Sequence, residues 1–88
     1  RIVELRERDR VRVTDSFGRA TANGLKVLES LYSHPIISVN NIVELTQLSF
    51  MAANTLMNRF NESEILEEIT GYSRNRLFRY SAYVDLFV

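Results

Sequence analysis

Three arginines fall within six residues near the C-terminal end of the chain: Arg74, Arg76 and Arg79. Guanidinium groups bind phosphate oxygens, so this cluster, with the amide of Asn75 inside it, could hold a nucleic-acid backbone. Two or three such contacts would already make binding visibly salt-dependent. The same arginines could instead pair with Glu67 and Glu68, because opposite charges across a β-hairpin attract each other. The residue types alone leave both interpretations open.

A second group with binding chemistry lies on and just before the helix predicted from Phe50 to Asn61. Asparagine can pair with an adenine edge, and arginine with guanine or a phosphate. The residues that this helix would present to DNA are Ser49, Met51, Thr55, Asn58 and Arg59. Met51 offers no polar group, and Glu62 and Glu64 would repel phosphates. A helix face that is merely solvated is therefore the competing interpretation.

Residue types that support catalysis or metal binding are sparse. The chain has no cysteine and a single histidine, His34, which precedes the helix-ending Pro35 and suits a contact with helix carbonyls. Glu67 and Glu68 are adjacent on a predicted strand and point to opposite faces, so they cannot act as a carboxylate pair. We therefore expect no catalytic residue, no metal and no cofactor.

Composition favours a small globular domain. The chain has 88 residues, of which 45% are hydrophobic and 25% charged. Its formal net charge is zero, which argues against strong non-specific binding to nucleic acid. No apolar stretch is long enough for a membrane span, and the charged N-terminus lacks a signal-peptide pattern. We expect a piece of a longer cytoplasmic protein, with no membrane partner and no small-molecule ligand.

Periodicity predicts the elements that must position these groups. Residues 1–14 form a polar helix with a thin apolar stripe, and Asp15 or Ser16 caps a core helix that runs to about Ser33. Apolar spacing and cap residues then predict a short strand at Ile36 and Ile37, followed by a helix from Val39 to Gln47 that is capped by Ser38 and faces inward with Ile42 and Leu45. The next predicted helix runs from Phe50 to Asn61, is capped by Ser49, and faces inward with Ala53, Leu56, Met57 and Phe60. Strands at Ile65–Thr70 and Leu77–Ser81 follow, with Phe78 and Tyr80 on one face, and then a last helix capped by Ser81.

This order of elements is that of a winged helix-turn-helix. We predict an α+β, mainly α fold in which a three-helix core carries a β-wing of two or three strands. Residues 1–15 are predicted to be a linker helix from a preceding domain, and residues 16–88 the winged-helix domain. The linker helix could also serve dimerisation.

Several segments are similar to a known family. The match runs from Leu25 to Phe87 and includes His34–Val39, Leu48–Phe50 with Ala53 and Asn54, Ile65 with Leu66, Thr70–Phe78, Tyr80 and Tyr83. In this order and spacing the chain resembles the C-terminal winged-helix domain of Fic-family proteins. The family pattern usually has glycine before the Ile-Leu pair, where this chain has Glu64. In the family this glycine ends the preceding helix in a left-handed turn. A non-glycine residue in that conformation costs about 1 kcal/mol, so Asn61 or Ser63 could end the helix instead.

The resemblance implies a parent enzyme that transfers AMP from ATP to protein hydroxyls. That chemistry needs a His-Pro-Phe motif and a glycine-rich anion loop, whereas His34-Pro35 is followed by Ile36. We therefore expect a non-catalytic accessory and regulatory domain that binds double-stranded DNA. The alternative is a protein-interaction or dimerisation module that contacts a second copy of itself or the parent's catalytic domain.

Overall fold

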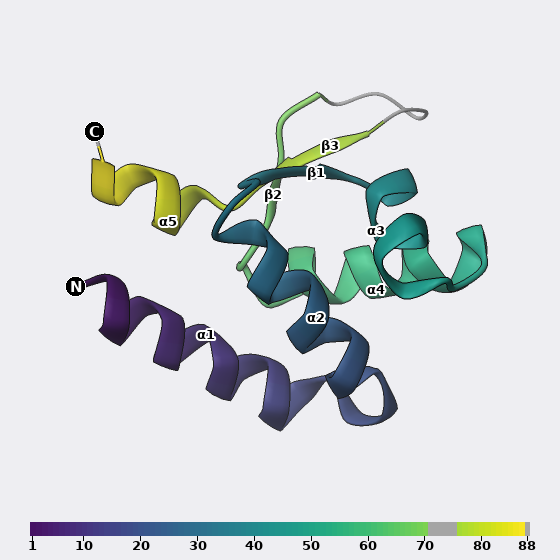
Figure 1. The fold of residues 1–88 in the computed structure, drawn as a ribbon, viewed down its shortest axis with the longest axis horizontal. Helices are drawn as coiled ribbons and strands as arrows, with labels where there is room; N and C mark the ends of the chain where they lie inside the picture. Colours follow the sequence, from purple (N-terminus) through teal and green to yellow (C-terminus); the bar gives the residue numbers. More distant parts are fainter. Residues whose placement is uncertain (71–75, 88) are drawn as a thin grey trace.

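Helices dominate the molecule, and a small sheet lies against them (Figure 1). The computed structural model describes residues 1–70 and 76–87. Its elements are α1 (Ile2–Ser16), a 3-10 turn η1 (Gly18–Ala20), α2 (Thr21–Leu31), β1 (Ile36–Ser38), α3 (Val39–Thr46), α4 (Phe50–Glu62), β2 (Glu67–Glu68), β3 (Leu77–Arg79), α5 (Ser81–Val84) and a 3-10 turn η2 (Asp85–Phe87). The predicted class, α+β and mainly α, is confirmed, and the order of elements is compatible with a winged helix.

The sheet is antiparallel with strand order β1-β3-β2. The central residue is Phe78, which pairs with Ile37 on one side and Glu68 on the other. Phe78 and Ile37 are buried, so this face of the sheet closes the core. The strands are shorter than predicted, because the regular ladder covers only Glu67–Glu68 and Leu77–Arg79.

Two predicted helix caps are confirmed. The Ser38 hydroxyl accepts the Asn41 amide at 3.2 Å, and the Asn41 side chain accepts the Ser38 amide in return, which completes a capping box. Ser49 accepts the Ala52 amide at 3.1 Å and begins α4. These short-range contacts fix where the two helices of the predicted helix-turn-helix start.

Two other predicted caps are wrong. Asp15 and Ser16 belong to the last turn of α1, where the Ser16 hydroxyl donates to the carbonyl of Arg12. The chain then bends through Gly18, which has φ +55°, before the core helix begins at Thr21 rather than at residue 16. Ser81 does not cap α5 either, because its hydroxyl donates to Glu67 at 2.9 Å.

α1 packs closely against α2 (Figure 1). Leu5 and Val13 are buried in the same cluster as the core helices, although the predicted apolar stripe was thin. Gly24 permits the close approach, since a Cβ there would lie 2.7 Å from the Phe17 ring and 2.9 Å from Val13. The division of the chain at residue 15 stays a prediction, but α1 contributes to the core that it adjoins.

The core lies where α1, α2, α3 and α4 meet the inner face of the sheet. Leu28, Ile42, Leu56, Phe60 and Phe78 are almost completely buried there. The predicted inward face of α4 is confirmed, whereas the prediction that Leu45 faces inward is wrong, because its side chain is 37% exposed.

Glu64 adopts the left-handed conformation that its position requires, with φ +64°. The Ile65 amide donates to the Phe60 carbonyl and the Glu64 amide to the Asn61 carbonyl, the two hydrogen bonds of a helix-ending Schellman turn. Glu64→Gly should therefore raise the free energy of unfolding by about 0.5 to 1 kcal/mol.

Urea denaturation of the two proteins measures this gain. Glu62→Gly is the matched control, because Glu62 is still helical and glycine there should cost about 1 kcal/mol. Equal effects of the two substitutions would contradict the assignment of strain to Glu64.

Candidate binding surface

The first turn of α4 exposes two large apolar side chains. Phe50 is 61% and Met51 80% exposed. They follow Ser49, whose hydroxyl is already occupied by the Ala52 amide. Of the predicted DNA-contacting residues here, Ser49 caps the helix and Met51 adds apolar surface. The leading turn of the helix therefore offers little to hydrogen-bond a base edge.

Further along α4, the predicted residues divide between solvent and the protein. Asn58 is exposed, and the Thr55 hydroxyl donates to the Met51 carbonyl at 3.1 Å. Arg59 donates to the carbonyl of Ser16 at 3.3 Å, across the end of α1. Arg59 thus satisfies a helix-terminal carbonyl and ties α4 to α1. Thr55 and Asn58 remain the polar side chains on the outer face of α4 that could meet a ligand.

Arg76 forms a two-pronged ion pair across the hairpin. Its Nε and Nη2 atoms donate to the two carboxylate oxygens of Glu68 at 3.0 and 3.1 Å. Its guanidinium also lies 4.9 Å from the centre of the Phe78 ring. Bidentate pairing is the strongest arrangement open to an arginine and a carboxylate. The expectation of cross-hairpin pairing therefore holds for Arg76.

Arg79 is also engaged. Its Nη2 atom donates to Asp85 at 3.0 Å, its Nη1 atom donates to the Ser81 hydroxyl at 3.0 Å, and Glu67 lies 4.0 Å away. The pairing with Asp85 is a contact that sequence reasoning missed. Arg74 and Asn75, the other predicted wing residues, lie outside the described residues.

Charge divides unevenly between the two halves of the chain. Residues 39–88 contain six acidic residues against four arginines, a net charge of −2. Residues 1–38 contain seven cations against five acidic residues, a net charge of +2. The half that includes α3, α4 and the hairpin of β2 and β3 is therefore the acidic one, which opposes phosphate binding.

A buried carboxylate joins α1 to the end of β3. Asp9 is fully buried and accepts the Tyr80 hydroxyl at 2.5 Å, while Arg8 and Arg12 lie 3.2 and 3.7 Å from its other oxygen. Burial, and then the adjacent Asp9 carboxylate, raises the pKa of Tyr80 far above its ordinary value. Burial also raises the pKa of neighbouring Tyr32, whose ring packs against Tyr80.

Sequence reasoning missed this polar contact, although a signal was present. Leu5, Asp9 and Val13 recur every four residues, which places all three on one helix face. A carboxylate between two core residues must be paired if it is buried. The pattern indicates that Asp9 is buried, but it does not identify the partner.

Within residues 1–70 and 76–87, no three His, Asp or Glu side chains come together in a way that could hold a metal ion. No helix in this part of the chain is both long enough and apolar enough to cross a bilayer.

No protein-family model matches the chain, and no curated protein or solved structure matches it significantly.

Proposed function

We propose that the chain is a non-catalytic winged-helix accessory module that binds another protein. The order of helices and strands supports the winged-helix assignment. The resemblance to the C-terminal domain of Fic-family proteins supports the accessory role, in which a neighbouring domain would carry the AMP-transfer chemistry.

One observation carries the choice of a protein partner over DNA. On the helix-turn-helix half, Arg59, Arg76 and Arg79 are engaged within the molecule, while Phe50 and Met51 face solvent. A DNA-reading helix needs polar groups at its N-terminal turn and free cations beside it. Exposed aromatic and methionine side chains are instead typical of the centres of protein interfaces.

Duplex DNA is the second candidate partner. Thr55 and Asn58 lie on the outer face of α4, where a docked helix would meet base edges. The sequence also places Arg74 and Asn75 on the predicted wing loop. Under this alternative, the described ion pairs would open on contact with phosphates.

Sedimentation across a range of concentrations, with and without a labelled DNA duplex at low salt, tests the proposal. We expect no saturable binding of DNA by the unaltered chain. If a second copy is the partner, the mass rises with concentration, and Phe50→Ser with Met51→Ser weakens association at least about tenfold, because two apolar anchors are lost.

Val3→Ser is the control, because Val3 is an apolar residue on α1 whose exposure lies between those of Phe50 and Met51. A mass that stays monomeric excludes a second copy as the partner. Saturable, salt-dependent DNA binding by the unaltered chain would contradict the proposal itself.

A further inference from the structure

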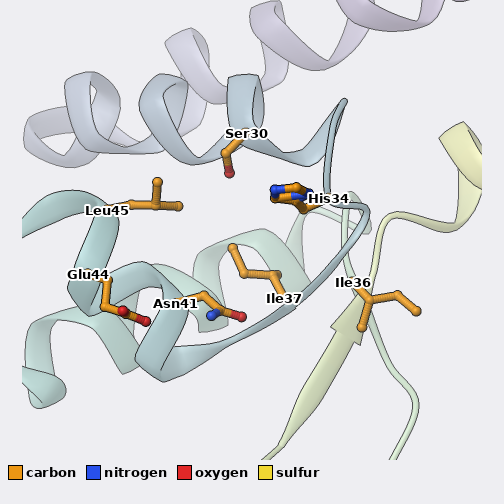
Figure 2. A pocket seen from close by; sticks show the side chains of 7 residues that line it. All are labelled: Ser30, His34, Ile36, Ile37, Asn41, Glu44 and Leu45. Atoms are coloured by element: carbon orange, nitrogen blue, oxygen red, sulfur yellow. The ribbon is translucent and has the colours of Figure 1, made fainter.

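A pocket of about 360 Å³ lies between α2, β1 and α3, and none of the predicted DNA-contacting residues lines it (Figure 2). Its apolar walls come from Ile37 of β1, which is buried, and Leu45 of α3, which is 37% exposed. In Figure 2 the Leu45 and Ser30 side chains point into the same space from α3 and α2. The volume is at the small end of the range for ligand sites, so it suits a single side chain.

Hydrogen bonds already made around the pocket define what it can still offer. The Ser30 hydroxyl donates to the Val27 carbonyl at 2.8 Å and keeps its lone pairs free to accept. The side-chain Oδ1 atom of Asn41 accepts a hydrogen bond from the Ser38 backbone amide. His34 places its Nδ1 atom 2.9 Å from the neighbouring Ser33 carbonyl.

Glu44 decides the electrical character of the pocket. It is the one acidic side chain in the lining, and it forms no ion pair with any residue in the described part of the chain. Asn41, Glu44 and Leu45 share a face of α3 by their spacing of three and four residues. The two helix ends at the pocket, the C-terminus of α2 and the N-terminus of α3, have opposite partial charges. These partial charges oppose each other, so the Glu44 carboxylate determines the sign of the electrostatic potential in the pocket.

We propose that this pocket receives a lysine or arginine side chain of the partner protein, an inference that rests on the proposed protein-binding function. The aliphatic stem lies against Ile37 and Leu45, and the cationic group reaches Glu44 and the Ser30 oxygen at the rim. Long basic side chains bury their stems in this way while their charged ends stay near water.

Two small probes test the proposal by NMR on the ¹⁵N-labelled chain. N-acetyl-lysine N-methylamide supplies the stem and the charge, and N-acetyl-norleucine N-methylamide supplies a similar stem without the charge. We expect the lysine probe to shift the amide signals of Ile37, Asn41, Glu44 and Leu45, and to bind more tightly than the norleucine probe. Glu44→Gln should weaken the lysine probe about fivefold, as expected for one exposed ion pair, and leave the norleucine probe unchanged.

Glu7→Gln is the matched control, because it removes an exposed acid from α1, far from the pocket along the chain. Equal binding of the two probes, no shift at the pocket, or the same loss in Glu7→Gln and Glu44→Gln would each overturn the proposal. These results do not depend on the outcome of the sedimentation experiment. If the lysine probe gives no pocket shift and the chain binds no DNA, only the proposed lysine or arginine site is excluded. If the chain binds DNA in a salt-dependent way, the proposed protein-binding function is excluded.

Discussion

Asp9→Ala is expected to lower the free energy of unfolding by about 2 to 3 kcal/mol. The substitution leaves the buried Tyr80 hydroxyl without its acceptor and removes the anchor of Arg8 and Arg12. For a domain of this size the whole stability is on the order of 4 to 13 kcal/mol, so the loss is a large fraction of it.

The effect should be concentrated in α1. Few apolar side chains hold this helix to the core, chiefly Leu5 and Val13, so the buried carboxylate accounts for much of its attachment. Hydrogen exchange should show that α1 amides lose protection while those of α4 keep most of theirs.

Urea denaturation of Asp9→Ala, Tyr80→Phe and the double variant measures the contact directly. We expect a coupling energy of about 1 to 3 kcal/mol between the two positions. Glu7→Ala, an exposed acid on the same helix, is the matched control and should change stability by less than about 0.5 kcal/mol. Additive single effects, or equal losses for Asp9→Ala and Glu7→Ala, would contradict the assigned role of Asp9.

Local signals in the sequence predicted much of the fold. Ser38 and Ser49 cap their helices because the partner amides are three residues away, a distance that sequence spacing reports directly. The strand at Leu77 was predicted from the alternation of Phe78 and Tyr80, and both side chains are buried. The left-handed conformation at Glu64 was indicated by the family resemblance, in which glycine ends the helix at this position, and Glu64 adopts it.

Contacts between distant segments escaped prediction. Asp9 and Tyr80 are 71 residues apart, so no local pattern connects them. α2 begins at Thr21, after a bend at Phe17 and Gly18, and Phe17 packs closely on Gly24 across the two helices, a contact that no local pattern reports. The exposed Phe50 was predicted as the start of a helix, but its exposure depends on how α4 is oriented on the core.

Releasing the paired arginines should turn the hairpin into a phosphate-binding surface. Glu68→Gln removes the carboxylate that pairs with Arg76, and Asp85→Asn removes the closest carboxylate to Arg79. The double variant gains two units of positive charge and weakens the hold on both guanidinium groups. Each phosphate contact adds about −0.9 to the slope of log affinity against log salt, so the new binding should weaken steeply with salt.

The matched control is Glu4→Gln with Glu7→Gln, which changes the net charge equally but on α1. If overall charge alone governed the interaction, this control would bind as well as the hairpin variant. We expect it to bind at least about tenfold more weakly, since its substitutions free neither Arg76 nor Arg79.

Fluorescence anisotropy of a labelled duplex, read at 50 and 200 mM salt, is the most direct measurement of whether the ion pairs keep this surface from DNA. We expect no saturable signal with the unaltered chain and a salt-sensitive signal with Glu68→Gln plus Asp85→Asn. Equal binding by the two proteins, or none by either, would contradict the role assigned to these ion pairs.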